Sequence, residues 1–378
     1  MELSIVMPCL NEEKTISSCI QKSKSFLDEN NIEGEVIVAD NGSTDGSVNL
    51  AISLGAKIVN VNKKGYGSAI IGGVKKSKGK YVIIGDADNT YDFSNLRMFI
   101  DNLRSGDDLV MGNRFLGGIK KGAMPFKNKY IGNPILSFIG RLFYKTNIRD
   151  FHCGLRGFSR KSFDLMNLTT TGMEFASEMV VKASLLGLKT CEVPIILYPD
   201  NRDRNPHLRP WRDGWRHLKF LFIFSPKWLF MYPGIISIIF GLISIIILMT
   251  TKIQLFGVNT HYTLMLYNSA LILIGIQFFS FYIFSSVNAK NNYAYIGDKL
   301  FEKITNGFTF ERGILFGSIL IVLGFILTLN AYLNWKKYLY IKYVIFDSLT
   351  LVIPSVLSIT AGIQIIIISL LLYILKIR

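Results

Sequence analysis

Four long apolar segments after residue 227 constrain this chain more than any other feature of its sequence. They cover residues 228–249, 265–287, 314–333 and 349–375. A helix needs about 20 residues to cross the ~30 Å hydrocarbon core of a bilayer, and each segment reaches that length. Helices of a soluble core are the alternative, but they rarely run past about 20 residues without a charge. The sequence therefore predicts an all-α transmembrane domain of four helices over residues 228–378.

Composition and the chain start agree with a membrane protein. Half of the 378 residues are hydrophobic and only 18% are charged, which is unusual for a soluble enzyme. The sequence after Met1 has no basic region that leads into an apolar run of signal-peptide length, so we expect residues 1–227 to stay in the cytosol. Four crossings return the C-terminus to the same side. These features predict a multi-pass protein of the cell membrane with a cytosolic N-terminal domain and C-terminus.

The N-terminal domain alternates short β-branched runs with amphipathic helical patterns. The predicted strands cover residues 3–7, 35–39, 57–61, 81–85 and 108–111, and the predicted helices cover 14–29, 46–54, 68–76 and 94–102. This order predicts an α/β fold with a mostly parallel, Rossmann-like sheet that is covered by helices. Ligands of such sheets bind beyond the carboxyl ends of the strands, so the loops there are the first candidates for a site.

Two carboxylates follow the apolar strand at residues 81–85. Asp86 and Asp88 are separated by Ala87, and a rigid strand delivers both into the expected crevice. Carboxylate oxygens of this kind suit Mg²⁺ or Mn²⁺ that bridges a diphosphate. A solvated acidic turn is the alternative for an isolated Asp-x-Asp. The position of Asp86 and Asp88 at a strand end favours the metal site.

The loops after the second and third strands offer nucleotide contacts. The carboxylate of Asp40 can accept hydrogen bonds from a nucleobase or ribose, although a plain turn in which Ser43 or Asp45 caps the next helix is the alternative. Gly65 opens another helix and can bring backbone donors near a nucleotide. Ile70 occupies the third-glycine position of the dinucleotide fingerprint, and no P-loop spacing is present, so neither of those motifs is predicted.

Two amphipathic basic segments lie near residues 129–146 and 207–227. No acidic residue occurs between Asp108 and Asp150, while basic and apolar side chains alternate there. In a membrane-anchored chain, the natural partner of such a segment is an anionic lipid surface or headgroup, and nucleic acid is the disfavoured rival. The second segment either anchors at the interface or carries arginines that close over phosphates.

Together these motifs resemble glycosyltransferase family 2, and within it the polyprenyl-phosphate glycosyltransferases such as dolichol-phosphate mannose synthase. The resemblance spans roughly residues 3–220 and rests on the segments 8–13, 40–45, 86–88, 112–115 and 150–158. It implies a GT-A fold and an inverting transfer of a hexose. The implied donor is a UDP- or GDP-linked sugar, and the implied acceptor is the phosphate of a membrane polyprenol or dolichol.

The resemblance also implies roles for individual residues. Those implied to bind the nucleotide are Pro8, Leu10, Asn11, Glu12, Asp40, Gly65, Asp86 and Ala87. Asp86 and Asp88 would hold Mg²⁺ or Mn²⁺. Those implied to contact the acceptor phosphate are Arg114, Lys129 and Asn133, and those implied to contact phosphate from a mobile loop are Arg202, Arg204 and Arg209.

Asp88, Asp150 and Arg114 are the implied catalytic set. An acceptor phosphate already carries a charge of about −1.5 to −2 near neutral pH, so a general base is scarcely needed. We therefore expect Asp150 to orient the acceptor, the sugar or the metal shell. Glu174 and Glu178 resemble the acidic helix of the family, or they are solvated or structural carboxylates.

The sequence departs from the family pattern at several of these positions. Leu155 replaces the phenylalanine of the Gly-Phe-Arg motif, and Lys129 and Asn133 stand where the mannose synthases have arginine and serine. The arginine-rich loop lacks the Gly-x-Ser of the family, so mannose specificity does not follow from the resemblance.

Two other functions remain as alternatives. A processive polysaccharide synthase shares the fold and the membrane helices but typically carries a Gln-x-x-Arg-Trp motif, which this sequence lacks. A non-catalytic translocase or scaffold that only binds nucleotide sugar has less need of the full acidic set. Small residues in the membrane helices allow packing within one chain or in a homo-oligomer.

Overall fold

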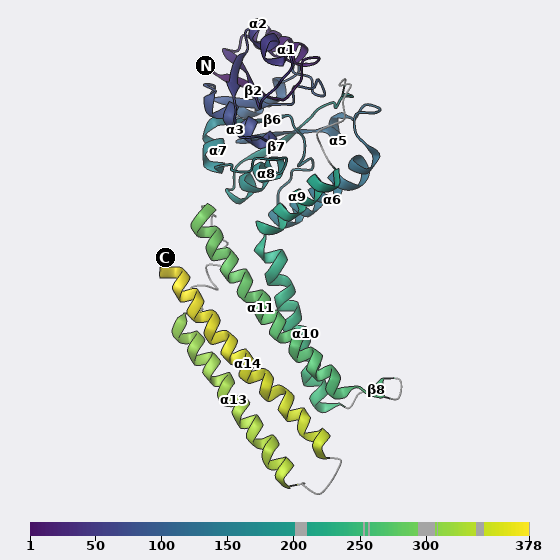
Figure 1. Ribbon diagram of the computed structural model, residues 1–378, viewed down its shortest axis with the longest axis vertical. Helices are drawn as coiled ribbons and strands as arrows, with labels where there is room; N and C mark the ends of the chain where they lie inside the picture. Colours follow the sequence, from purple (N-terminus) through teal and green to yellow (C-terminus); the bar gives the residue numbers. More distant parts are fainter. Residues whose placement is uncertain are drawn as a thin grey trace. The chain divides into compact units, whose positions relative to one another are not determined.

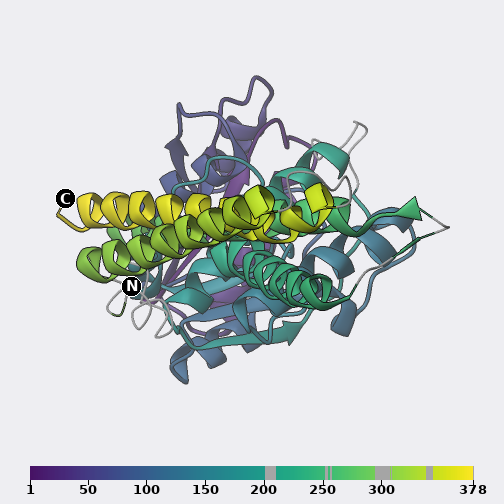
Figure 2. The same cartoon turned by 90° about the horizontal axis from the view of Figure 1, so that it is seen from below.

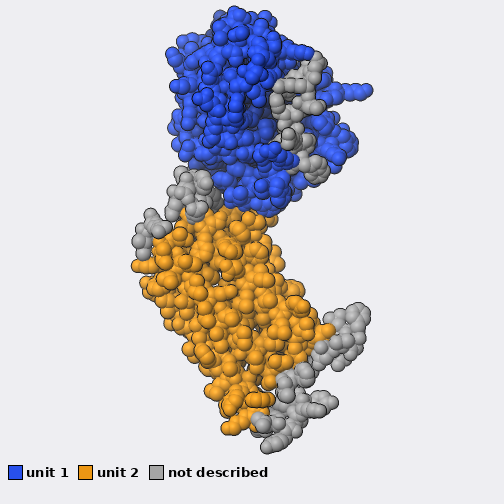
Figure 3. Space-filling view, viewed as in Figure 1, with its two compact units in different colours: residues 1–224 blue, residues 225–378 orange. Residues whose placement is uncertain are grey.

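The computed structural model describes residues 1–200, 210–251, 254–255, 258–293, 307, 309–337 and 344–377. The chain divides into two compact units, Met1–Phe224 and Ser225–Arg378, which Figure 3 shows in different colours. The loop arginines of the sequence prediction, Arg202, Arg204 and Arg209, lie outside the described residues.

A seven-stranded sheet forms the centre of the first unit. Its strands are β1 (Leu3–Cys9), β2 (Gly34–Asp40), β3 (Lys57–Asn60), β4 (Tyr81–Ile84), β5 (Leu109–Asn113), β6 (Arg156–Ser159) and β7 (Thr190–Pro194). Their spatial order is β3-β2-β1-β4-β6-β5-β7, with β6 antiparallel to both of its neighbours and every other pair parallel. The carboxyl ends of the parallel strands and the start of β6 therefore meet at one edge, which we call the carboxyl edge.

Helices pack on both faces of this sheet (Figure 1). Those of the first unit are α1 (Ile16–Glu29), α2 (Ser47–Ser53), α3 (Tyr66–Lys76), α4 (Arg97–Arg104), α5 (Arg114–Gly117), η1 (Asn128–Gly132), α6 (Asn133–Tyr144), α7 (Arg160–Met166), α8 (Phe175–Leu185) and α9 (Pro210–Ile223). Successive side chains of a strand point to opposite faces. Ile5 and Met7 accordingly enter the core under α1, α2 and α4, while Val6 enters the core under α3, α7, α8 and α9.

The predicted α/β class and mostly parallel sheet are confirmed. The five predicted strands correspond to β1–β5 and the four predicted helices to α1–α4, with small shifts of their ends. Strands β6 and β7 were not predicted. The run Arg156–Ser159 carries an arginine and a glycine and lacks the apolar alternation that signals a strand.

The second unit contains the membrane helices. Its elements are η2 (Lys227–Met231), α10 (Tyr232–Thr250), β8 (Gln254–Leu255), β9 (Val258–Asn259), α11 (His261–Tyr293), α13 (Phe310–Lys337) and α14 (Val344–Ile377). Within the described ranges, four segments are long and apolar enough to cross a membrane, namely Lys227–Thr250, His261–Val287, Phe310–Lys336 and Ser348–Leu375. The four predicted membrane helices are therefore confirmed, each with slightly different ends.

Glycines bring the membrane helices close together in pairs. Helices α13 and α14 run side by side, as both views of the ribbon show (Figures 1 and 2). A methyl group on Gly324 would lie 2.8 Å from the carbonyl oxygen of Ser355, and one on Gly362 would lie 2.5 Å from that of Gly317. The pair α10 and α11 contains Gly234, Gly241 and Gly275 in similar contacts. Small residues of this kind let helix backbones approach in a bilayer, where no hydrophobic effect drives helices together.

We expect Gly324→Leu to destabilise the α13–α14 pair. Its side chain would meet Ser355 and Ile359, and overpacking of this kind typically costs about 1–3 kcal/mol. The matched control is Ile326→Leu, because Ile326 is 51% exposed on the same helix. Thermal unfolding of both variants in lipid nanodiscs tests the expectation, and equal unfolding temperatures for the two would contradict it.

Candidate active site

The loops after β1 and β2 form one hydrogen-bonded layer at the carboxyl edge. The backbone N–H of Asn11 donates to Ser43 Oγ at 2.9 Å, and the N–H of Thr44 donates to Asn11 Oδ1 at 2.7 Å. The buried carboxylate of Asp40 accepts from the N–H groups of Gly42 and Ser43, each at 3.0 Å. Asp40 therefore shapes the turn, and its remaining lone pairs are compatible with the nucleotide contact that the sequence predicts.

Gly65 is joined to the same layer through Asn41. The N–H of Gly65 donates to Asn41 Oδ1 at 2.7 Å, while Asn41 Nδ2 donates to the carbonyl oxygens of Val61 and Lys63. The φ of Gly65 is +127°, and a Cβ there would lie 2.2 Å from the carbonyl oxygen of Thr171. Only glycine fits this position without strain.

The end of β1 lies next to the Asp-x-Asp segment. Pro8 belongs to β1, and Leu10 and Glu12 follow it, with Glu12 buried. Thr15, just before α1, donates its hydroxyl to the carbonyl oxygen of Ala87 at 2.7 Å. The structure thus gathers the predicted nucleotide residues around one end of β1.

Asp86 and Asp88 have different surroundings. Asp88 is buried, and its Oδ1 accepts from the N–H and the hydroxyl of Thr90 at 3.1 and 2.5 Å. Asp86 is half-buried beside Gly154, where a Cβ would lie 2.4 Å from Asp86 Oδ2. Burial, the charge of Asp86 and a hydrogen bond to Asp86 raise the pKa of the Tyr66 phenol well above its usual value. Tyr66 therefore stays protonated beside the carboxylate.

The Asp-x-Asp carboxylates suit a metal ion that is only partly held by protein. Among the described residues, no three His, Cys, Asp or Glu side chains gather into a metal-binding group. Mg²⁺ is usually bound by one or two carboxylates together with substrate phosphates and water, and it rarely occupies a cage made of protein alone. The oxygens of Asp86 and Asp88 therefore fit an ion that is shared with a diphosphate.

Arg114 and Asp150 form a buried ion pair at the opposite side of the carboxyl edge. Arg114 Nε lies 2.8 Å from Asp150 Oδ2, Nη2 lies 2.7 Å from Oδ1, and the backbone N–H of Arg114 donates to Oδ2 at 3.0 Å. The Asp150 side chain is fully buried and that of Arg114 is 9% exposed. Burial alone would lower the pKa of Arg114, but the charge of Asp150 and its hydrogen bonds raise that pKa well above its usual value.

Neighbouring strands hold both members of this pair in place. Asn113, the last residue of β5, caps α5 by accepting from the N–H groups of Phe115 and Leu116 at 2.9 Å each. Glu192 of β7 accepts from the N–H groups of Arg149 and Asp150 at 2.7 and 2.9 Å. Arg114 is thus held at the capped start of α5, and Glu192 holds the backbone at Asp150.

A second buried arginine shapes the loop between Asp150 and β6. Arg156 donates to the carbonyl oxygens of Cys153, Ala176 and Phe151 at 2.7, 2.8 and 3.0 Å. The phenol of Tyr91 accepts from the N–H of Gly154 at 2.8 Å, which joins this loop to the segment after β4. The arginine of the Gly-Leu-Arg-Gly-Phe motif is therefore structural, and it brings the loop against Asp86.

The predicted acceptor residues Lys129 and Asn133 lie on η1 and at the start of α6. Lys129 Nζ lies 5.3 Å from the centre of the Tyr130 ring, and Asn133 Nδ2 lies 3.5 Å from Met124 Sδ. Helix α6 packs its buried face on the loop after Asp150, since the N–H of Phe151 donates to Ser137 Oγ at 3.4 Å. The contacts of α6 therefore link the segment that carries these residues to the Asp150 segment.

Two histidines pack beside the same loop. The rings of His152 and His217 are 4.4 Å apart, and Ser177 Oγ lies 2.8 Å from His217 Nδ1 and 3.4 Å from His152 Nε2. Burial, with the neighbouring His217, Arg114 and Arg156, holds the pKa of His152 well below its usual range. His152 is therefore neutral near pH 7, and the cluster ties α8 and α9 to the loop.

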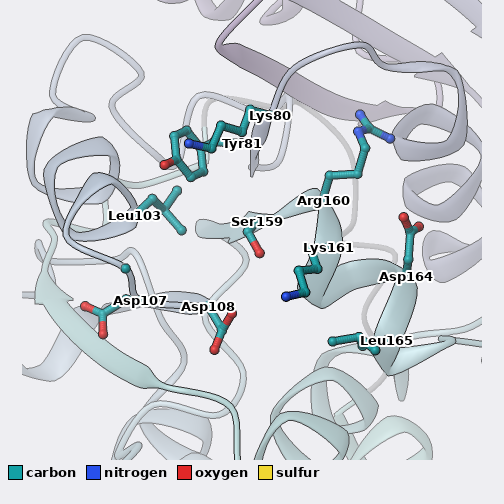
Figure 4. A pocket seen from close by; sticks show the side chains of 11 residues that line it. Lys80, Tyr81, Leu103, Asp107, Asp108, Ser159, Arg160, Lys161, Asp164 and Leu165 are labelled. Atoms are coloured by element: carbon teal, nitrogen blue, oxygen red, sulfur yellow. The ribbon is translucent and has the colours of Figure 1, made fainter.

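A hollow at the other edge of the sheet contains none of the predicted site residues (Figure 4). It has a volume of about 830 Å³ and is lined by both signs of charge. Arg160 there is already bound by the carbonyl oxygens of Gly79 and Val74 and by Ser77 Oγ, and Asp108 accepts from the N–H of Lys189. These side chains serve the fold, and the candidate chemistry stays at the carboxyl edge.

The sequence analysis did not assign a role to several residues that shape the candidate site. Asn41 lies inside the segment 40–45 that the resemblance rests on, so its turn chemistry gave some signal. Tyr66, Tyr91 and Glu192 gave none, because each acts through a contact with a segment distant in sequence.

The chain matches two sequence families. Glycosyl transferase family 2 matches residues 4–166, and the glycosyltransferase family 2 C-terminal transmembrane region matches residues 283–376. The first match contains the β1, β2 and β4 loops together with Arg114 and Asp150. The second covers α13 and most of α14.

Curated relatives and solved structures are similar as well. The low-salt glycan biosynthesis hexosyltransferase Agl6 of Haloferax volcanii is 36% identical over 85% of this chain and 77% of its own length. A dolichyl-phosphate hexose transferase of the same organism is 29% identical over 51% of this chain and 82% of its own. The structure of glucosyl-3-phosphoglycerate synthase from Mycobacterium tuberculosis aligns with a TM-score of 0.48 and 22% identity, covering 59% of this chain and 79% of that one.

We expect the Arg114–Asp150 pair to dominate the local stability of the first unit. Asp150→Asn leaves the charge of Arg114 buried without its partner, and Arg114→Gln does the same to Asp150. Losing one member of a buried ion pair typically costs about 3–5 kcal/mol. The double variant should cost less than the sum of the two. Chemical unfolding of the purified variants measures the cycle.

The control for this cycle is the exposed pair Arg97–Asp101, whose atoms also approach to 2.8 Å. Arg97→Gln should cost less than about 1 kcal/mol, because water screens an exposed pair. Equal losses for Arg114→Gln and Arg97→Gln would contradict the structural role of the buried pair.

Proposed function

The chain belongs to glycosyltransferase family 2, and we propose that it transfers a hexose from a nucleotide-diphosphate donor to the phosphate of a membrane polyprenol. The observation that carries the proposal is that the Asp-x-Asp segment and the Arg114–Asp150 pair lie at one sheet edge, in a chain with four membrane helices. The contact of Tyr91 with Gly154 joins the two segments. The relative named as a dolichyl-phosphate hexose transferase supports the same class of acceptor. UDP- and GDP-linked sugars are the donors we would test.

The donor side of the proposal rests on the layer around β1. Asp40 offers a carboxylate to the nucleoside, and Pro8, Leu10, Asn11, Glu12 and Gly65 would line its binding site around the end of β1. Asp86 and Asp88 would hold Mg²⁺ or Mn²⁺ against the diphosphate. The ion would supply Lewis-acid stabilisation of the charge on the leaving group.

The acceptor side rests on an apolar stripe along η1 and α6. Its exposed side chains are Phe126, Tyr130, Ile131, Ile135, Phe138 and Leu142. Large exposed apolar surfaces mark interaction sites, and here Lys127 and Lys129 flank the stripe, as expected for an anionic lipid surface. The opposite face of α6 packs on the loop after Asp150. We expect this helix to bring a lipid phosphate towards Arg114.

The proposed step needs no general base. An oxygen of the acceptor phosphate attacks the anomeric carbon, the bond from that carbon to the diphosphate oxygen breaks, and the nucleoside diphosphate leaves with the electron pair, inverting the configuration. Both oxygens of Asp150 already accept from Arg114, which argues against Asp150 as a proton acceptor. Positioning and charge stabilisation then supply the catalysis. Arg114 binds Asp150 through Nε and Nη2, so its Nη1 can face a phosphate. Lys129 on η1 and Asn133 on α6 would be further contacts.

The proposal includes an orientation. The first unit and the C-terminus would face the cytosol, where nucleotide sugars are made, and the chain would be a multi-pass protein of the cell membrane. The four candidate spans among the described residues support the same side for both. Arg202, Arg204 and Arg209 would contact phosphate from the segment before α9.

We expect Asp88→Asn to abolish sugar transfer, because the neutral amide weakens the hold on a cation and a diphosphate. The assay incubates purified protein with Mg²⁺ or Mn²⁺, a polyprenyl phosphate and labelled UDP- or GDP-sugars, and extracts labelled lipid. Asp101→Asn is the control, because Asp101 is an exposed acid on α4. Near-full transfer by Asp88→Asn at saturating metal would refute the assignment. Nucleotide binding without transfer by the wild type would favour the scaffold alternative.

We expect Phe138→Asp to raise the KM for a long-chain polyprenyl phosphate by about tenfold or more, because burial of such a side chain is worth about 1.5–3 kcal/mol. The KM for the nucleotide sugar should not change. Leu165→Asp is the control, since Leu165 is similarly exposed on α7. Equal effects of both variants, or an equal effect on a short water-soluble acceptor, would argue against α6 as the lipid-binding helix.

A further inference from the structure

The sequence left the role of Glu178 on α8 open between an acid of the family and a solvated or structural carboxylate. Its side chain is fully buried, which excludes the solvated interpretation. Glu178 binds the loop over residues 169–172, and this loop packs against the start of α3. We propose that Glu178 is a positioning residue for the nucleotide donor, because the start of α3 adjoins Gly65 of the proposed donor site. The inference therefore rests on the proposed function.

Glu178 binds the loop through both of its carboxylate oxygens. Oε1 accepts from the N–H and the hydroxyl of Thr169 at 3.0 and 3.1 Å. Oε2 accepts from the N–H and the hydroxyl of Thr170 at 2.9 and 2.6 Å. Two consecutive backbone N–H groups and two hydroxyls thus converge on one carboxylate. An amide cannot replace it, because the amide nitrogen donates and would leave one threonine without its acceptor.

Glu178 stays ionised in the interior because Lys182 pairs with it. Lys182 Nζ lies 2.8 Å from Glu178 Oε1 and also donates to the carbonyl oxygen of Asn167 at 2.6 Å. Burial alone would raise the pKa of Glu178, but the hydrogen bonds from Lys182 and Thr170 hold that pKa below its usual value. Hydrogen bonds to an ionised acceptor are about twice as strong as neutral ones, so the loop is held firmly.

The loop meets the start of α3 through one hydrogen bond and two close backbone contacts. The N–H of Ser68 donates to the carbonyl oxygen of Thr171 at 3.2 Å. A Cβ on Gly65 would collide with the carbonyl oxygen of Thr171, and one on Gly67 would collide with that of Thr170. Glycine permits this close approach of two backbones. A shift of the loop would therefore move the start of α3 with it.

The start of α3 is joined to the donor side of the site. Gly65 is bound to Asn41 of the layer around β1, and Tyr66 forms a hydrogen bond to Asp86 of the Asp-x-Asp segment. A displacement of Gly65 and Tyr66 would therefore disturb the proposed nucleoside contact and the proposed metal ligand together. Misplacement of a site by about 1 Å can cost about 10²-fold in rate, so Glu178 can affect the donor without touching it.

Titration calorimetry of the detergent-purified full-length protein with UDP and GDP in the presence of Mg²⁺ tests the proposal. Glu178→Gln combined with Lys182→Met weakens the hold on the loop without leaving a buried charge unpaired. We expect this double variant to weaken nucleotide binding about tenfold or more. Thr170→Val removes one hydroxyl donor and should weaken binding less. In the transfer assay both variants should raise the KM for the nucleotide sugar and leave the KM for polyprenyl phosphate unchanged.

Ser162→Ala is the matched control for Thr170→Val. The hydroxyl of Ser162 donates to the carbonyl oxygen of Asp108 at 2.7 Å, at the other edge of the sheet. The control should lower the unfolding temperature to a similar extent and leave nucleotide affinity unchanged. Equal losses of affinity for Thr170→Val and Ser162→Ala, or wild-type affinity in the double variant, would overturn the inference and leave the proposed function standing. A wild type that binds neither UDP nor GDP would overturn the proposed donor, and the inference with it.

Discussion

The buried ion pair of Arg114 and Asp150 is the interaction on which the carboxyl edge depends. Removing a charge from water costs several kcal/mol, so neither side chain would be stable there alone. The pair is tolerated because three donors of Arg114 meet the two oxygens of Asp150, and because Glu192 binds the backbone that enters the loop. Strands β5 and β7 and the segment before β6 are thereby joined at one point. A neutral packing contact would not fix the direction of a guanidinium in this way.

The sequence predicted those parts of the fold that have a strong local signal. Strand β1 alternates buried side chains between two cores, and each membrane helix contains a long, strongly apolar segment, so both were evident from the pattern. Strand β6 gave no such signal. Its buried Arg156 is stabilised by three carbonyl oxygens from the loop and from α8, a solution that exists only once the chain has folded. Arginine is rarely fully buried, and four residues give too little alternation to signal a strand.

The residues of the candidate site differ in the same way in how far the sequence predicts their positions. Asp40, Asp86 and Asp88 follow apolar strands, and the topology of a parallel sheet is enough to bring them to one edge. The pairing of Arg114 with Asp150 spans 36 positions and depends on the antiparallel strand that the pattern did not reveal. The sequence therefore predicted that these three carboxylates lie at one edge, but not that the arginine implied for the acceptor would be bound to the aspartate implied to orient it.

This pairing narrows the chemistry that the edge can support. The Asp150 carboxylate accepts from two guanidinium nitrogens and the backbone N–H of Arg114, so both of its oxygens are committed to the ion pair and are not available as a general base. A neutral hydroxyl acceptor would need such a base, whereas a phosphate monoester brings its own charge. His152 is neutral beside the pair, but it packs against Ser177 and His217 in the interior. The commitment of Asp150 to Arg114 therefore agrees with the proposed acceptor, a lipid phosphate that arrives already ionised.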